Sequence, residues 1–472
     1  MALPFPSDEP FLRGYYAPLL AECDADNLPV SGELPKDLNG WLYRNGPNPQ
    51  FAPRGPYHWF AGDGMLHAFH VENGRVAYRN RWVRTPKWEL EHAEREGLSG
   101  AFGNPRYSDP RIVELGSTLA NTNVVWHGGR LLALEEAHAP FEVDPVTLAS
   151  KGSWNYGGRL AGPMTAHPKI DADGEMVFFG YAATGRYTPE VALHVADKDG
   201  RLVRSDMLAA PFPSMVHDFV VTRDWIVLPI FPLTGSMERA QTGRPPYAWE
   251  PELGTHVALI PRRGSVADAR WFRGDPSYVF HPMNAYDTPD GKVVCDMMQY
   301  PVAPLFPLPD GRPSTDAPPS ACLVRWTLDP NGGTERYDEQ PLDDHPGEFP
   351  RLDERYTGRP YRHGYFQAGA VTDAEGRLAS RSGIAHIDHA SGRVALWRPG
   401  PEDRCGEPIF VPRRPDAAEG DGYLLSVIFR AETQCSDLAV FDATDVAAGP
   451  IALAHLSHRV PAGFHGNWRN AG

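Results

Sequence analysis

Four histidines lie in short apolar, β-like stretches beside Pro, Asp or Gly, where strands begin or end. Gaps of 50, 64 and 184 residues separate them, and the last gap is close to three of the shorter ones. A four-stranded propeller blade takes about 40 to 60 residues. One histidine at the start of the inner strand of several blades would bring the imidazoles to a shared axis. The spacing therefore predicts a metal site formed by His167, His217, His281 and His465.

Neutral imidazole ligands suit Fe(II), Zn(II), Cu or Ni. Their second ring nitrogen usually donates to a carboxylate, which fixes the orientation of the ring. Three glutamates in strand-like or turn settings could do this, Glu136, Glu348 and Glu407, although a solvated surface position is the ordinary alternative for each. The local pairs in HAFH, HIDH and HLSH would point to opposite faces of a strand. We expect no chelation by these pairs.

Many short antiparallel strands are expected to position these residues. The 46 glycines and 48 prolines are spread through the chain, and hairpin dipeptides such as Asn73-Gly74, Asp173-Gly174 and Asp290-Gly291 precede β-branched or aromatic runs. Helical periodicity is weak, with candidates at 11–23, 88–96 and 236–242. We predict an all-β chain, a single β-propeller domain over residues 1–472 with seven blades of about 60 residues. Cap loops are expected as insertions near 85–110, 232–254 and 301–319.

Composition limits the partners and the compartment. A formal net charge of −15 argues against a nucleic-acid partner, because phosphate binding needs clustered Lys and Arg. The five widely spaced cysteines include no C-x-x-C, which favours reduced thiols in a cytoplasmic protein. We find no signal-peptide pattern, and the most apolar run, 225–233, is too short to span a bilayer. Peripheral membrane contact stays open, with 301–309 as a candidate segment, and no obligate protein partner is indicated.

Nine short motifs follow one another between about residues 30 and 470: RNGPNP (44–49), WFAGDGMLHAF (59–69), TAHPKID (165–171), MVHDFVVT (215–222), FHPMNAYD (280–287), EFPRLDERYTGRPYRHGY (348–365), GEPIFVPR (406–413), EGDGYLLSVIF (419–429) and FHGNW (464–468). This ordered set resembles the carotenoid cleavage oxygenase family. Local similarity in WEPELG (249–254), IPRRG (260–264), RWFRGDP (270–276) and EGDGYLLSV (419–427) leans toward the bacterial members of that family.

The resemblance implies a seven-bladed propeller with one non-haem Fe(II) per subunit, held by the four histidines, and a helical and loop cap over the iron face. It maps the orienting carboxylates to Glu136, Glu348 and Glu407. The implied reaction splits a conjugated carbon–carbon double bond with O2 and gives two carbonyl products. No NAD or flavin motif is present, since GDGMLH lacks the G-x-G-x-x-G pattern.

The substrate end of the site is predicted from three residues. Relatives that cleave stilbenes hold a phenol hydroxyl with a Phe, a Tyr and a Lys. Here the Phe is kept as Phe60, the Lys position is Glu135, and the Tyr is missing because the stretch that carries it is shortened to 101–110, so two of the three contacts are altered. We therefore predict a carotenoid or apocarotenoid, with a stilbene or phenylpropanoid alkene as the alternative. Phe280 is expected to line an apolar tunnel. Strand alternation would turn Glu135 toward the cavity to accept from a substrate hydroxyl, unless it meets an Arg or solvent.

Two other functions stay open at this stage. The retinoid isomerohydrolase activity of the family uses the same iron without oxygen, and the spacing of the motifs does not exclude it. A propeller could also serve as a binding scaffold with histidines on its axis. Absence of bound iron, together with unchanged activity of His281→Ala, would favour the scaffold.

Overall fold

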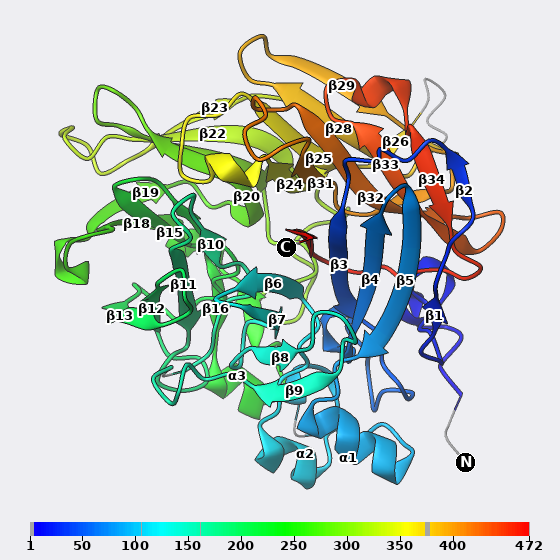
Figure 1. Ribbon diagram of the computed structural model, residues 1–472. Coiled ribbons are helices and arrows are strands. Elements are labelled where there is room, and N and C mark those ends of the chain that lie inside the picture. The colour runs from blue at the N-terminus through cyan, green and yellow to red at the C-terminus, as the bar shows by residue number, and fades with distance from the viewer. Residues whose placement is uncertain (1–3, 105, 161, 373–377, 472) are drawn as a thin grey trace. The chain divides into compact units, whose positions relative to one another are not determined.

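The computed structural model describes residues 4–104, 106–160, 162–372 and 378–471. It divides into two compact units. One comprises residues 1–157, 371–383 and 397–472, and the other comprises 158–370 and 384–396. Figure 1 labels the strands of both, and each unit is described below by itself.

The first unit contains three antiparallel sheets of at least four strands. The first has the order β1 (Asp24–Ala25), β5 (Arg75–Trp82), β4 (Gly64–Glu72), β3 (Gly40–Pro47) and β35 (Gly466–Asn470). The second has the order β6 (Asn123–His127), β7 (Arg130–Leu134), β8 (Phe141–Val143) and β9 (Ser150–Ser153). The third has the order β2 (Val30–Gly32), β34 (Ala452–His455), β33 (Cys435–Asp442), β32 (Gly422–Arg430) and β30 (Arg404–Cys405), and β31 (Ile409–Pro412) also pairs with β32. A separate hairpin pairs β26 (Val371–Thr372) with β27 (Leu378–Ser380).

The second unit contains four sheets of four strands. The strands of the first of these sheets have the order β10 (Lys169–Ile170), β11 (Met176–Tyr181), β12 (Glu190–Ala196) and β13 (Leu202–Ala209). The next two sheets have the orders β14 (Val220–Val221), β15 (Trp225–Ile230), β18 (Thr255–Pro261) and β19 (Arg270–Gly274), and β20 (Tyr278–Asp287), β21 (Val293–Tyr300), β22 (Cys322–Leu328) and β23 (Asp338–Pro341). The last sheet has the order β24 (Gly347–Leu352), β25 (His363–Ala368), β28 (Gly383–Asp388) and β29 (Arg393–Trp397). A separate hairpin pairs β16 (Leu233–Gly235) with β17 (Tyr247–Trp249). These four sheets and the three of the first unit are the blades of a seven-bladed β-propeller, so the predicted fold class is confirmed.

The first unit joins the two ends of the chain within single sheets. Strand β35 pairs with β3 in a register that sets Arg44 opposite Gly466, and β2 pairs with β34. Apolar side chains of the first and third sheets form one core cluster, including Leu42, Phe69 and Leu425. Burial of this apolar area stabilises the pairing of segments that are more than 400 residues apart in sequence.

Turn chemistry agrees with the sequence at the predicted hairpins. Asn73 and Gly74 have φ angles of 50° and 74° and join β4 to β5. Both residues occupy the left-handed region that a tight two-residue hairpin requires, and that region favours Asn and Gly.

Helices are few and short. The helix expected at 88–96 is α1 (Pro86–Glu94), and the one expected at 236–242 is α3 (Met237–Gln241). The helix expected at 11–23 is wrong, because that segment has only two 3₁₀ turns, η1 (Pro10–Leu12) and η2 (Gly14–Tyr16), and no helix over 17–23. Pro18 is one cause, since proline disfavours a helical residue before it. The sequence analysis missed α2 (Pro110–Leu115) and the remaining 3₁₀ turns, η3 (Trp59–Ala61), η4 (Ala101–Gly103), η5 (Pro251–Leu253), η6 (Val266–Asp268), η7 (Glu354–Tyr356) and η8 (Val446–Ala448).

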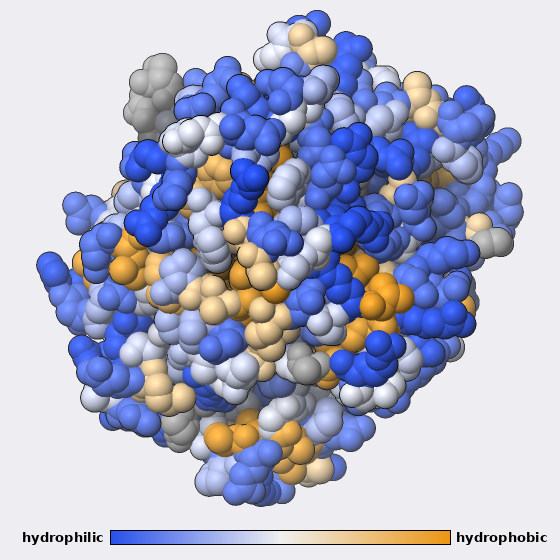
Figure 2. Space-filling view, turned by 90° about the vertical axis from the view of Figure 1, so that its left-hand side faces the viewer, coloured by the Kyte–Doolittle hydropathy of each residue, from blue (hydrophilic) through white to orange (hydrophobic). Residues whose placement is uncertain are grey.

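The three expected insertions differ in structure. Residues 85–110 carry α1 and η4, and 232–254 carry β16, α3, β17 and η5, whereas 301–319 contain neither helix nor strand. Leu305 in this last segment is 51% exposed. Figure 2 shows a face covered mainly by hydrophilic side chains with separate hydrophobic patches between them. Within the described ranges, every helix is too short or too polar to cross a membrane.

Candidate metal centre

Three of the four predicted histidines come from the innermost parts of neighbouring sheets in the second unit. His167 lies two residues before β10, His217 three residues before β14, and His281 is the fourth residue of β20. Each of these strands stands at the edge of its sheet. All three side chains are buried. His167 and His217 thus lie just before the edge strand of their sheet, and His281 lies within one, whereas the sequence predicted each histidine at the first position of a strand.

The three imidazoles converge through their Nε2 atoms. The Nε2 atom of His217 lies 3.1 Å from that of His167 and 3.2 Å from that of His281. The potential ligand atoms of the three side chains all lie within 4.8 Å of one another. Lone pairs of neutral imidazoles repel each other at such distances, whereas a cation between them would be attracted to all three. This donor set fits a late first-row divalent metal.

A carboxylate fixes the proton of His281. Its Nδ1 donates to Oε2 of Glu348 over 2.5 Å, and the same oxygen accepts from the backbone N–H of Phe349 over 2.6 Å. Because an ionised carboxylate only accepts, the proton is on Nδ1 and the lone pair of His281 is on Nε2. The structure thus brings Glu348, one of the three glutamates that the resemblance implies as orienting residues, to His281.

His167 has a different acidic neighbour. Its Nδ1 lies 3.6 Å from Oδ2 of Asp218, which is an electrostatic contact beyond ordinary hydrogen-bond length. The other oxygen of Asp218 accepts from Nζ of Lys169 over 2.7 Å. The sequence analysis did not single out Asp218 or Lys169, although each lies within two residues of a candidate ligand.

Aromatic rings surround the histidine cluster. Phe280, a predicted substrate contact, is buried and packs edge-on against His217, with ring centroids 5.0 Å apart. Phe349 stacks on His281 at 5.2 Å. The analysis of the sequence missed Phe349, although its position directly after Glu348 in the EFP stretch was a usable signal. These rings make the surroundings apolar and favour an uncharged, conjugated ligand.

His465 lies in the first unit, immediately before β35, and is buried. Its Nδ1 donates to Oε1 of Glu407 over 2.9 Å, and the backbone N–H of Gly466 donates to Oε2 of Glu407 over 2.8 Å. The carboxylate therefore directs the Nε2 lone pair of His465 in the same way as Glu348 does for His281.

Glu135 and Glu136 follow the end of β7 and do not form part of it. The strand ends at Leu134, so the expected alternation of the two side chains across a strand does not apply. Both residues are partly buried. The role of Glu136 in orienting a histidine stays a prediction.

Protein donors hold the carboxylate of Glu135. Its Oε2 accepts from Oγ1 of Thr118 (2.9 Å), the backbone N–H of Leu119 (3.1 Å) and Nδ1 of His138 (2.9 Å). Burial raises the pKa of Glu135, but hydrogen bonds from His138, Leu119 and Thr118 outweigh it and hold that pKa below its usual value. The protein partners of this oxygen are His138 and the turn at 118–119, whereas the sequence suggested an Arg or solvent as the alternative to a substrate hydroxyl.

Phe60 lies in η3 among other rings of the first unit. It packs edge-on against His58 (4.6 Å between centroids) and Phe464 (5.5 Å), and Phe464 also contacts Trp59 at 4.5 Å. Nδ2 of Asn121 donates to the carbonyl of Phe60 over 2.8 Å. The segment that Glu135 holds, 118–121, thus also fixes the backbone of Phe60.

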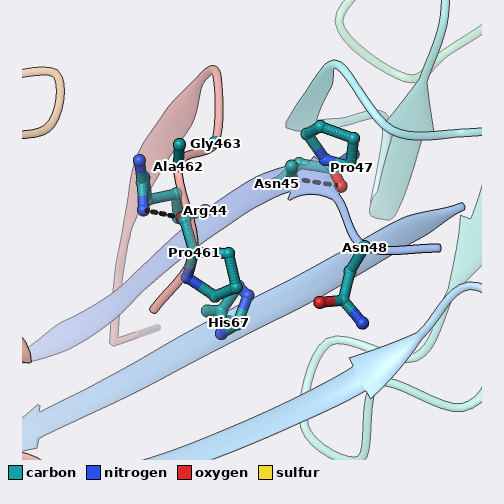
Figure 3. A pocket seen from close by; sticks show the side chains of 9 residues that line it. Arg44, Asn45, Pro47, Asn48, His67, Pro461, Ala462 and Gly463 are labelled. Atoms are coloured by element: carbon teal, nitrogen blue, oxygen red, sulfur yellow. Dashed lines mark hydrogen bonds between the residues drawn. The ribbon is translucent and has the colours of Figure 1, made fainter. Parts of the chain in front are cut away.

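The RNGPNP motif lines a narrow pocket of the first unit. Figure 3 shows Arg44, Asn45, His67 and Pro461 around it. Nη1 of Arg44 donates to the carbonyl of Pro461 over 3.2 Å, and Nδ1 of His67 pairs with the hydroxyl of Tyr78 over 2.8 Å. The side chain of Arg44 therefore ties β3 to the backbone of the segment before His465.

A second histidine and carboxylate group, Asp343, Asp344 and His345, lies in the loop between β23 and β24. The Asp344 side chain is fully exposed, and Nδ1 of His345 is already 2.7 Å from Oδ1 of Asp343. Exposed acidic groups of this kind are common in proteins without a metal.

The pattern of the family described as retinal pigment epithelial membrane protein (RPE65) matches residues 16–470. The chain belongs to this family. The sequence is 37% identical to isoeugenol monooxygenase of Pseudomonas nitroreducens, over 98% of both chains. The structure matches that of Pseudomonas brassicacearum lignostilbene dioxygenase with a TM-score of 0.94 and 36% identity, covering 100% of both chains. The structure also matches that of cobalt-substituted Synechocystis apocarotenoid oxygenase, with a TM-score of 0.85 and 31% identity, covering 98% of both chains.

These similarities confirm the resemblance to the carotenoid cleavage oxygenases and establish the reaction class. The chain is an enzyme of the alkene-cleaving dioxygenase type. The buried histidines described above are compatible with the metal site that this chemistry needs.

Proposed function

We propose that the chain is a non-haem Fe(II) dioxygenase that cleaves a conjugated carbon–carbon double bond with O2. The convergence of the Nε2 atoms of His167, His217 and His281 carries this proposal. His465, already oriented by Glu407, is proposed as the fourth ligand. Bound ferrous iron would supply the activation of O2, which organic side chains do not perform.

The residues of the chain do the positioning. Glu348 and Glu407 hold protons on Nδ1 of their histidines and so keep the opposite nitrogens available to a cation. Glu136 is proposed to do the same for another histidine. Phe280 and Phe349 exclude water from the side of the cluster that they cover, which would limit side reactions with solvent.

An aryl alkene of the phenylpropanoid or stilbene kind is the substrate class that we favour. Support comes from the identity of 37% to isoeugenol monooxygenase and 36% to lignostilbene dioxygenase, against 31% to apocarotenoid oxygenase. The rings of Phe60, His58 and Phe464 would stack on a planar aryl group. This choice reverses the preference for an apocarotenoid drawn from the sequence.

An apocarotenoid is retained as the second candidate because of Glu135. A carboxylate occupies the position of the lysine that helps to hold a phenol in stilbene-cleaving relatives, and three protein donors already engage it. A polyene would need no such polar contact, since apolar and aromatic walls suffice to bind it.

Product analysis under isotopically labelled oxygen tests the proposal. The purified protein, loaded with ferrous iron, is given isoeugenol, a hydroxystilbene and an apocarotenal under ¹⁸O2. Carbonyl products are reduced at once with borohydride to stop exchange with water. We expect cleavage of at least one substrate into two carbonyl compounds, each with one labelled oxygen, because both atoms of O2 enter the products.

Failure to consume any substrate by a protein that holds iron would overturn the proposal, as would label in only one product. Faster cleavage of the apocarotenal than of both aryl alkenes would select the second candidate.

A further inference from the structure

Only one oxygen of the Glu348 carboxylate is satisfied by hydrogen bonds. Oε2 accepts from Nδ1 of His281 and from the N–H of Phe349. Oε1 is buried, and none of the described residues donates a hydrogen bond to it. A buried carboxylate oxygen without a donor is costly, because it has lost water and gained nothing in return. Such an atom in the support of a metal ligand calls for a partner.

The backbone around Glu348 cannot supply that partner. Phe349 has a φ angle of 52°, in the left-handed region that phenylalanine rarely adopts, and a β-bulge follows Glu348. This turn of the chain directs the Phe349 N–H to Oε2 and leaves Oε1 on the other side of the carboxylate. The adjacent backbone thus serves Oε2, and a side chain on a neighbouring strand is in a position to serve Oε1.

Tyr300 is the neighbouring group with the required chemistry. It is the last residue of β21, it is buried, and β21 contacts β24, the strand that carries Glu348. Its ring packs edge-on against Phe280, with centroids 6.1 Å apart, and Phe280 in turn packs against His217. Tyr300 therefore stands beside the histidine cluster.

The electrostatics of Tyr300 agree with this position. Burial, together with the charge of Glu348, raises the pKa of the Tyr300 hydroxyl well above its usual value. The contact between β21 and β24 places the two residues on neighbouring strands. A phenol that keeps its proton at neutral pH meets a carboxylate as a donor.

We propose that Tyr300 is a positioning residue for the metal centre, with its hydroxyl donating to Oε1 of Glu348. The carboxylate is then held from three sides: by Tyr300, by the N–H of Phe349 and by Nδ1 of His281. This arrangement keeps Glu348 in the orientation that receives the His281 proton and makes His281 a better ligand. The inference rests on the proposed function, because it takes His281 as a metal ligand.

Metal affinity of Tyr300→Phe tests this role without reference to turnover. Co²⁺ binding to the metal-free protein is measured by competition with a chromophoric chelator, and the visible absorption of bound Co²⁺ reports the ligand geometry. Loss of a support of this kind costs about 10- to 100-fold in metal affinity. We expect a weakening in that range together with a changed cobalt spectrum.

A matched control separates this effect from the loss of any buried hydroxyl. Tyr337 is buried in the same unit and packs against Trp326 with tilted rings, whose centroids are 4.6 Å apart. Tyr337→Phe is expected to bind Co²⁺ as tightly as the wild type. Thermal unfolding of the metal-free variants confirms that each has folded.

A double-mutant cycle with Glu348→Gln decides whether Tyr300 acts through the carboxylate. Tyr300→Phe should weaken Co²⁺ binding in the wild-type background and have little further effect in Glu348→Gln. An unchanged affinity of Tyr300→Phe, or the same loss in both backgrounds, overturns the inference. A wild-type protein that binds neither Co²⁺ nor Fe²⁺ would instead overturn the proposed function.

Discussion

Histidines of this chain differ in what holds their Nδ1 atom. In His281 and His465 a glutamate accepts the Nδ1 proton, so that the lone pair of each ring is on Nε2. In His67, by contrast, Nδ1 pairs with a tyrosine hydroxyl, and burial, with Arg44 and His458 adding to it, holds the pKa well below its usual value. A glutamate behind the ring therefore orients two of the candidate ligands, but a carboxylate at Nδ1 does not by itself mark a ligand, because His138, His345 and His455 have one as well.

Glu135→Gln is expected to lower stability without changing substrate preference. The amide keeps acceptor capacity for Thr118 and Leu119 but loses the charge-assisted bond from His138. Charged hydrogen bonds contribute about 1.5 to 3 kcal/mol. Because protein donors already hold Oε2, kcat/KM for a phenolic alkene and for its methyl ether should change by the same factor. A loss confined to the phenol would mean that Glu135 contacts the substrate hydroxyl.

The stability difference between Glu135→Gln and the wild type should depend on pH. The pKa of Glu135 is lower in the folded protein than the value of about 4.3 in an unfolded chain. The stabilisation is therefore complete above that value and is lost as pH falls through the folded pKa. Urea denaturation at pH 7 and at pH 3.5 should show a larger difference at pH 7. Glu114→Gln, at an exposed position, is the control.

At the scale of elements, a buried charge cluster attaches helix α1 to the start of β4. Nζ of Lys87 lies 2.7 Å from Oδ1 of Asp63 and 2.7 Å from Oε2 of Glu91, and all three side chains are buried. The other oxygen of Glu91 accepts from the N–H groups of Leu98 and Ser99. Burial and the charge of Asp63 raise the pKa of Glu91, and the opposing effect of Lys87 does not cancel this rise.

Lys87→Met should destabilise the protein strongly, because it leaves two buried carboxylates without their cation. Breaking a buried ion pair by removing one partner costs about 3 to 5 kcal/mol. Protonation of Glu91 would relieve the repulsion, so the loss should shrink as pH falls from 8 to 5. Urea unfolding at several pH values measures both effects.

The control for this change is Arg111→Met in α2. Arg111 pairs with Glu94 and Asp109 at an exposed position. Exposed pairs are screened by water and salt, so no comparable change is expected. Equal destabilisation by the two substitutions would show that the Lys87 cluster has no special role.

For the whole molecule, metal binding and folding stability should be linked. A ligand that binds only the folded state stabilises it by RT ln(1 + [L]/Kd), about 2.7 kcal/mol at 100 times Kd. The thermal midpoint of the metal-free protein should rise with the logarithm of added Co²⁺ concentration. The rise should vanish in His281→Ala and persist in His345→Ala, which alters the exposed histidine of the 343–345 loop. An equal rise in both variants would place the stabilising metal elsewhere.

The sequence determined the all-β class, because strand and turn signals are local: alternating apolar residues and Asn-Gly or Asp-Gly pairs specify hairpins wherever they occur. It also determined the family, through an ordered set of motifs. It failed at 11–23, where apolar spacing suggested a helix that the structure does not form.

Only the tertiary structure decided which side chains meet. His167, His217 and His281 are 50 and 64 residues apart, yet their Nε2 atoms lie 3.1 and 3.2 Å from one another. The end of β7 before Glu135, the bond from Thr118 to that residue and the left-handed turn at Phe349 likewise depend on packing. The local pattern of apolar and turn residues specifies each strand or hairpin. The contacts between distant strands depend on how their buried faces pack together, and the spacing of residues along the chain does not specify those contacts by itself.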